Sequence, residues 1–254
     1  MTKPGIMTGK EAFMNNIAQR LGRPTPLAEA PERPFIGAPD FYQQRKRTVD
    51  ERVDEFVHNW TALSGKVLIV EEAEAPQAIA AYIAQVCDEH DIHRIARWEH
   101  EQLLKLGLDA PLAEAGIETV AWRADGADHL ADVPAQGNWA SRSKLLQAAE
   151  TSRLGVVWPD CAVANTGTLV LFSEGGKGRS VSLLTEALVA VFHVNQLVYR
   201  MGEAFAKFKQ AYPELDARPS SLNLITGPSR SADIENDLTI GIHGPGKVHA
   251  VLIK

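Results

Sequence analysis

The feature that most constrains the fold is a regular alternation of short apolar runs with longer amphipathic stretches, which starts after Asp40. The runs at residues 67–70, 92–96 and 117–122 have the length and composition of strands. Helical periodicity marks the stretch that ends near Leu63 and residues 75–89, 101–106 and 141–154. Because strand, helix, strand order with short connections favours parallel pairing, the sequence predicts an α/β fold with a mainly parallel sheet flanked by helices.

The second half of the chain is denser in strand signals. They occur at residues 168–172, 180–184 and 188–192, and again at 222–225, 238–240 and 248–253. The run at 222–225 is expected to be a buried strand that stops at a turn containing Gly and Pro. Five apolar residues at helical spacing predict one helix with a core face: Leu197, Met201, Phe205, Phe208 and Tyr212.

The N-terminal part has a different character. Apolar positions between Lys10 and Leu21 fall on one helical face, and Gly22 follows as a stop. Five prolines then exclude a continuous helix: Pro24, Pro26, Pro31, Pro34 and Pro39. We therefore expect two parts, residues 1–39 as an amphipathic helix on a Pro-rich tether and residues 40–254 as the α/β domain. The helix can dock on a neighbouring subunit as readily as on its own domain.

Composition excludes several classes of function. A net charge of -6 and a pI near 5.8 argue against a nucleic-acid partner, which would need a basic face. We see no transmembrane segment and no secretory signal, so the expected location is cytoplasmic. Cys87 and Cys161 lack CxxC spacing, so we expect no metal site and no iron–sulfur cluster bound by this chain alone. The usual Gly-rich signatures for dinucleotides and NTPs are also missing.

Two C-terminal loops follow predicted strands and carry groups that can bind a small anion. In the first, Gly227, Ser229 and Arg230 precede residues 231–236, which could begin a short helix with free amides. The alternative is a capped loop in which Arg230 makes a structural ion pair. The second loop contains His243, which can donate to an anion or simply pack at a strand end.

A central segment offers similar chemistry. Thr166, Gly167 and Thr168 can present hydroxyls and close-approach amides, while Lys177 and Arg179 supply positive charge from a Gly-rich turn after the next strand. The same residues are also compatible with an ordinary turn and an exposed hairpin tip.

Several of these segments together strongly resemble the LUD-domain family, of the lactate utilization protein C (LutC/YkgG) type. They are Thr166-Gly-Thr-Leu-Val-Leu, Ser182-Leu-Leu, Thr226-Gly-Pro-Ser-Arg-Ser-Ala-Asp-Ile-Glu, His243-Gly-Pro and Val248-His-Ala-Val-Leu. The resemblance runs from about residue 40 to 254. It implies a NagB/RpiA/CoA-transferase-like fold and a role beside two iron–sulfur proteins that oxidise L-lactate to pyruvate.

Two positions depart from the pattern of that family. Asn165 stands where relatives commonly have Glu before Thr-Gly-Thr, and Thr185 replaces a usual Pro. Asn cannot ionise, so covalent carboxylate catalysis from position 165 is not expected.

The leading hypothesis is an accessory subunit of an L-lactate-oxidising complex, whose iron–sulfur clusters sit on partner proteins. Its small-anion pocket would comprise Thr166, Gly167, Thr168, Arg179, Gly227, Ser229, Arg230 and His243. One alternative is a stand-alone enzyme acting on a phosphorylated sugar, a folate or a CoA ester. Another is a structural or regulatory protein that holds a partner through its N-terminal helix.

Overall fold

The computed structural model describes residues 8–29, 32, 47–123, 140–232 and 238–254. The chain divides into two compact units, Met1–Lys46 and Arg47–Lys254. The boundary expected after residue 39 falls outside the described residues. In the first unit, α1 (Lys10–Arg20) begins after Gly9 and buries Ala18, whereas Phe13 and Leu21 are exposed.

The core of the second unit is a six-stranded parallel sheet in the order β1-β12-β7-β4-β2-β3. The strands are β1 (Lys66–Val70), β2 (Arg94–Trp98), β3 (Glu118–Trp122), β4 (Leu154–Val157), β7 (Ala187–His193) and β12 (Lys247–Ile253). Five of these strands were predicted close to their observed positions. The exception is β4, because Leu154 begins a strand rather than ending the preceding helix.

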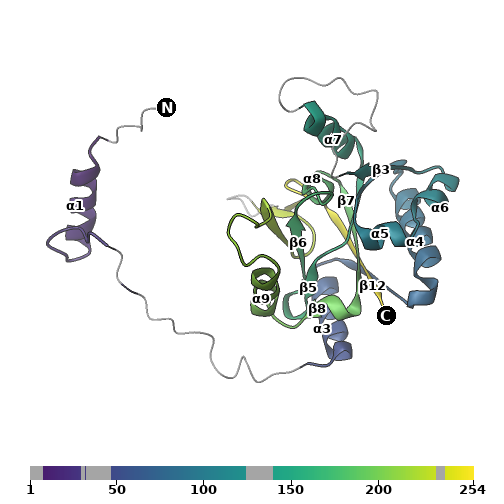
Figure 1. Ribbon diagram of the computed structural model, residues 1–254, viewed down its shortest axis with the longest axis horizontal. Helices are drawn as coiled ribbons and strands as arrows, with labels where there is room; N and C mark the ends of the chain where they lie inside the picture. The colour runs from purple at the N-terminus through teal and green to yellow at the C-terminus, as the bar shows by residue number, and fades with distance from the viewer. Residues whose placement is uncertain (1–7, 30–31, 33–46, 124–139, 233–237) are drawn as a thin grey trace. The chain divides into compact units, whose positions relative to one another are not determined.

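Helices connect and cover the strands of this sheet, which confirms the predicted α/β class (Figure 1). They are α3 (Val49–Ala62), α4 (Ala75–Glu89), α5 (Glu101–Lys105), α6 (Asp109–Glu114), α7 (Ala140–Thr151) and α8 (Ser180–Leu183). Thr48 and Glu51 form a capping box that starts α3. Within the core, Phe56 stacks on Trp60 at a centroid distance of 5.6 Å and meets Phe192 edge-on at 5.6 Å.

A second, four-stranded sheet has the order β8-β5-β6-β9. Its strands are β5 (Cys161–Val163), β6 (Thr168–Ser173), β8 (Leu197–Val198) and β9 (Ser221–Ile225). The helix α9 (Met201–Ala211) packs on this sheet, where the rings of Phe208 and Tyr212 contact Phe172. A two-stranded ribbon, β10 (Arg230–Ala232) with β11 (Leu238–Ile240), lies near the C-terminus.

The predicted strand at residues 180–184 is wrong, because the segment forms the helix α8. This helix lies directly on β4: a Cβ added at Gly155 would sit 1.9 Å from the Val181 carbonyl oxygen. Thr185 closes the turn by donating to the same carbonyl. Only glycine in β4 allows so close an approach, so the packing of α8 on β4 depends on a residue that is distant in the sequence.

Three further expectations need correction. Residues 231 and 232 belong to β10 and not to a helix, while 233–237 lie outside the described residues. The strand β9 is at the edge of its sheet, so Leu224 is exposed and Ile225 is its buried residue. The apolar stripe from Leu197 to Tyr212 is not one helix, because Leu197 is in β8. Nor is the stripe a continuous core face, because Phe205 is half exposed.

Candidate functional site

Three threonines form a hydroxyl chain at the start of β6. Thr166 ends the short 3-10 helix η3 (Ala164–Thr166), and its Oγ1 lies 2.8 Å from Thr168 Oγ1. Thr168 Oγ1 in turn lies 2.8 Å from Thr226 Oγ1 at the end of β9. The pairing of Leu169 with Ile225 in the β6–β9 ladder brings these distant segments together.

The two glycines of the predicted site approach helix α3 rather than open space. Gly167 has φ 58°, and a Cβ there would lie 2.8 Å from the Trp60 nitrogen. Gly227 has φ 76°, and a Cβ there would lie 2.8 Å from the Leu63 Cβ. Both positions therefore require glycine for backbone conformation and for packing against the carboxyl-terminal half of α3.

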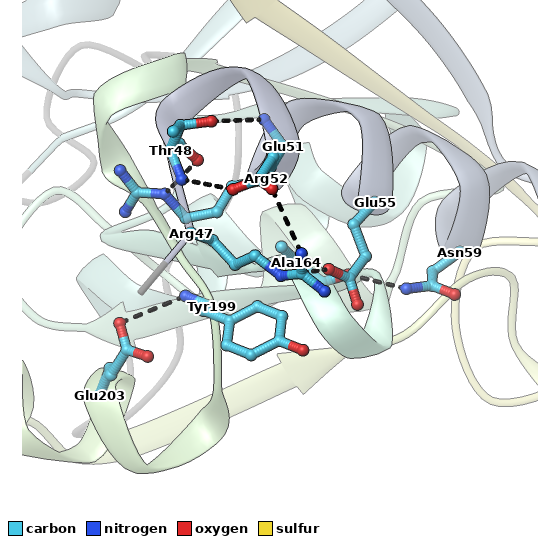
Figure 2. A network of polar contacts seen from close by, with 9 residues as sticks. All are labelled: Arg47, Thr48, Glu51, Arg52, Glu55, Asn59, Ala164, Tyr199 and Glu203. Atoms are coloured by element: carbon cyan, nitrogen blue, oxygen red, sulfur yellow. Dashed lines mark hydrogen bonds and ion pairs between the residues drawn. The ribbon is translucent and has the colours of Figure 1, made fainter. Parts of the chain in front are cut away.

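Polar contacts hold α3 on the same turn (Figure 2). Asn59 donates from Nδ2 to the Ala164 carbonyl oxygen across 2.9 Å. Arg52 donates to the carbonyl oxygen of Leu197. Figure 2 also shows Arg47 beside Tyr199, whose ring centroid lies 5.4 Å from the guanidinium carbon. Asn59 thus supports the turn that carries Thr166, while Arg52 and Arg47 contact the neighbouring segment at Leu197 and Tyr199.

Arg230 extends this helix contact. Its Nη2 donates to the Leu63 carbonyl oxygen across 2.6 Å, although the side chain is exposed. Leu63 is the C-cap residue of α3, so the guanidinium lies at the negative end of the helix dipole. The partner is a backbone carbonyl, whereas the sequence suggested a carboxylate or a bound anion.

The two C-terminal loops also meet each other. The His243 amide donates to Ser229 Oγ across 3.2 Å, and the Ser229 amide donates to the Pro245 carbonyl oxygen across 2.9 Å. The backbone of His243 and the side chain of Ser229 are therefore neighbours, as a shared anion site would require. Binding of an anion by these residues remains a prediction.

Arg179 lies apart from the other predicted residues. It precedes α8, which follows the far end of β6 from Thr168, and six residues of strand span about 20 Å. Figure 1 shows α8 and α3 at opposite ends of β6. The Gly-rich turn is held by Trp98, whose Nε1 donates to the Gly178 carbonyl oxygen across 2.8 Å. The eight predicted residues consequently do not form a single pocket.

A cleft of about 380 Å³ lies elsewhere, at the carboxyl ends of the parallel strands β2, β4 and β7. Its lining consists of His100, Gln102, Trp158, Pro159, Asp160, His193, Asn195 and Gln196. The strand β3 lies on one side of β2 in the sheet, and β4, β7 and β12 lie in that order on the other side. The direction in which strands are added therefore reverses between β2 and β4. Ligands of open α/β sheets bind at such a switch in strand order, outside the carboxyl ends.

Two imidazoles flank the buried indole of Trp158 in this cleft. The His100 ring stacks on Trp158 at 5.7 Å with an interplanar angle of 10°, and His193 meets it edge-on at 5.1 Å. Burial, and then the charge of Lys177, hold the pKa of His100 below its ordinary value. The Nδ1 atom of His193 lies 3.2 Å from Glu72 Oε2, which orients that ring.

Lys177 is a structural partner of the cleft rather than part of its lining. Its Nζ lies 2.8 Å from Asp160 Oδ1 and 3.0 Å from Glu174 Oε1, and Asp160 Oδ2 accepts from the Phe172 amide. We expected the Gly-rich turn to supply free positive charge, but the ammonium group of Lys177 is neutralised by these two carboxylates.

Sequence reasoning missed the residues of the cleft. His193 ends the apolar strand β7, and His100 follows β2 after one residue, so a polar residue just beyond a predicted parallel strand was an available signal. No such signal existed for Trp158, because β4 was not predicted.

Both positions that depart from the LUD pattern have simple surroundings. Asn165 is exposed in η3, and its backbone amide donates to the Tyr199 carbonyl oxygen. Thr185 is buried and bonded to α8. Neither of these residues lines the cleft.

Comparison with known proteins gives consistent matches over nearly the whole chain. The family model of the LUD domain matches residues 53–253. The chain is 30% identical to lactate utilization protein C of Bacillus licheniformis, covering 98% of this chain and 98% of that protein. It is 29% identical to lactate utilization protein C of Halalkalibacterium halodurans, covering 96% and 97%. The corresponding Bacillus subtilis protein is 28% identical, with coverage of 100% and 99%.

A solved structure shares the fold. The crystal structure of a DUF162 family protein from Deinococcus radiodurans matches with a TM-score of 0.54 at 17% identity. The match covers 82% of this chain and 100% of that chain. At this identity the likeness concerns the fold alone, and it agrees with a mainly parallel central sheet flanked by helices.

Proposed function

The chain belongs to the LUD domain family, and from this membership we propose that it acts in lactate utilization as an accessory subunit of an L-lactate-oxidising system. The observation that carries the proposal is the length of the match. Relatives named lactate utilization protein C align with 96% or more of this chain and 97% or more of their own length. A match of this extent includes the N-terminal unit as well as the LUD domain.

In this proposal the iron–sulfur clusters belong to partner proteins. A cluster usually needs four thiolates, and the whole sequence has two cysteines. Cys87 and Cys161 are buried in separate hydrophobic clusters, and burial raises the pKa of each thiol to about 11. Both are protonated at neutral pH and poorly suited to bind iron.

We further propose that this subunit works in the cytoplasm and binds a small anion at the loops that carry Ser229, Arg230 and His243. The contact between Ser229 and His243 supports the proposal that these loops bind an anion. No helix within the described ranges is long and apolar enough to cross a membrane.

The test is anaerobic purification of the full chain with its iron–sulfur partners, followed by lactate oxidation assays with and without this subunit. We expect omission to reduce L-lactate-dependent reduction of an artificial electron acceptor, and re-addition of the full chain to restore it. Iron and sulfide analysis of the isolated chain serves as the control. Unchanged lactate oxidation without the subunit would contradict the accessory role, and about four irons per chain would contradict the assignment of clusters to partners.

One observation favours a second candidate, a stand-alone enzyme. The cleft lies at the switch in strand order, where enzymes of open α/β folds bind their substrates. Turnover of a substrate by the isolated chain, with no partner present, would favour this candidate.

A further inference from the structure

The cleft at the carboxyl ends of β2, β4 and β7 is distinct from the loops proposed to bind an anion. Its lining comes from the turns after these strands, whereas Ser229, Arg230 and His243 belong to the ribbon and the loops beside β12. The ligand chemistry of the cleft can therefore be judged by itself, independently of the role in lactate utilization.

Apart from the carboxylate of Asp160, the lining presents flat aromatic surface and neutral hydrogen-bonding groups. His100 has one ring face against the indole of Trp158, and its Nδ1 accepts from the Gln102 backbone amide across 3.3 Å. Its other face is therefore the surface on which a ligand in the cleft can stack. The side chains of Gln102 and Asn195 contribute amides. A planar ring that carries nitrogen and oxygen atoms can stack on the imidazole and exchange hydrogen bonds with these groups.

The position of His193 is fixed for a directed hydrogen bond. Glu72 contacts its Nδ1, and the backbone amide of His193 donates to Gln196 Oε1 across 2.9 Å. The contact with Glu72 occupies one ring nitrogen, so Nε2 is the nitrogen that can bind a group in the cleft.

The charges around the cleft disfavour an anion. Its eight lining residues, all within the described part of the chain, include no Lys or Arg. Lys177, whose charge acts on His100, is offset by Asp160 and Glu174. A phosphate or carboxylate would approach the carboxylates of Asp160 and Glu72 without a cation of its own, which costs free energy.

We propose that this cleft binds a planar, nitrogen-containing ring with no net negative charge, stacked on His100 and hydrogen-bonded to His193. The volume of about 380 Å³ suits a ring system of small-molecule size. The ligand class includes the neutral rings of flavins, purines and nicotinamides.

The test is isothermal titration of the full chain with riboflavin, adenosine and nicotinamide, and in parallel with inorganic phosphate and L-lactate. We expect saturable binding of at least one neutral ring. His100→Ala should weaken that binding about tenfold or more because the stacking surface is lost. His193→Asn should weaken it to a similar extent because the directed hydrogen bond from the imidazole is lost. The matched control is His93→Ala, because His93 is exposed and lies outside the cleft.

Three outcomes would overturn the proposal. They are no saturable binding of any of the three rings, ring binding that neither cleft variant weakens, and phosphate or lactate binding that His100→Ala abolishes. Thermal unfolding of each variant shows whether it is folded before it is titrated. If His100→Ala is unfolded, His193→Asn and Glu72→Gln still test the hydrogen bond from His193, because the exposed Glu72 side chain lies 3.2 Å from His193 Nδ1.

Discussion

Arg230 donates a hydrogen bond from Nη2 to the carbonyl oxygen of Leu63, the C-cap residue of α3, across 2.6 Å. The contact joins the ribbon strand β10 to the first helix of the domain, which is far away in the sequence. It gives Arg230 a structural role that an anion-binding arginine would not need. The two roles can be separated by experiment.

We expect Arg230→Ala to lower the free energy of unfolding by about 1 kcal/mol, since an exposed hydrogen bond at a helix carboxyl end is lost. Arg230→Lys should restore part of this loss, because the ammonium keeps the charge but not the fork. Urea unfolding measures both variants, and Lys207→Ala, which removes an exposed cation from α9 before its last turn, serves as the control. Loss of lactate-dependent activity with unchanged stability would instead support the anion site.

Gly167→Ala should destabilise the domain by about 2 kcal/mol or more. The new Cβ would lie 2.8 Å from the Trp60 nitrogen, and the residue would have to keep φ 58°. Gly202→Ala is the matched control, because Gly202 lies in α9 with nothing within 4 Å of the added Cβ. That control should be neutral or slightly stabilising. Equal midpoints of chemical unfolding for the two variants would show that α3 does not pack tightly on Gly167.

Protonation of His249 should lower the free energy of unfolding as the pH falls from about 6.5 to 4. It is buried in β12, with Nδ1 2.8 Å from the Tyr82 hydroxyl, and burial lowers the pKa of this imidazole to about 4. In this pH range the unfolded chain binds the proton more readily than the folded one, so acid favours unfolding. Below pH 4 the free energy of unfolding should have fallen by the full amount, on the order of 3 kcal/mol.

Urea unfolding between pH 7.5 and 4.5 measures this dependence. In His249→Gln the slope of stability against pH should be shallower than in the parent, even if the variant is less stable at neutral pH. The exposed His93→Gln variant should keep the parental slope. Parallel pH profiles for the parent and His249→Gln would contradict the assignment to His249.

Deleting residues 1–39 should leave a domain that unfolds cooperatively. The main core consists of side chains between Val53 and Ile253, so its apolar contacts survive the deletion. We expect the truncation to impair association with partner proteins more than folding, because α1 presents Phe13 and Leu21 as exposed apolar side chains. Thermal unfolding and co-purification with partners measure the two effects. Loss of the unfolding transition would show that the N-terminal unit completes the core.

The sequence by itself determined the class of fold. The apolar runs that became β7 and β12 are buried on both faces, so continuous hydrophobicity over a few residues identifies them without knowledge of their partners. The capping box of α3 and the turn at Gly167 are equally local, since they depend on residues close together in the chain. The similarity to the LUD-domain family also rested on such local segments, and the family match confirms it.

Only the tertiary structure decided the identity of α8, the edge position of β9 and the composition of the cleft. The backbone of residues 180–183 lies directly on β4, and only Gly155 leaves room for it there. His100, Trp158 and His193 meet because β2, β4 and β7 are neighbours in the sheet although the chain visits β3 between the first two. Strand order depends on how the whole core is buried. Local sequence patterns do not depend on that order. They could therefore indicate where strands end, but not which strand ends lie next to each other.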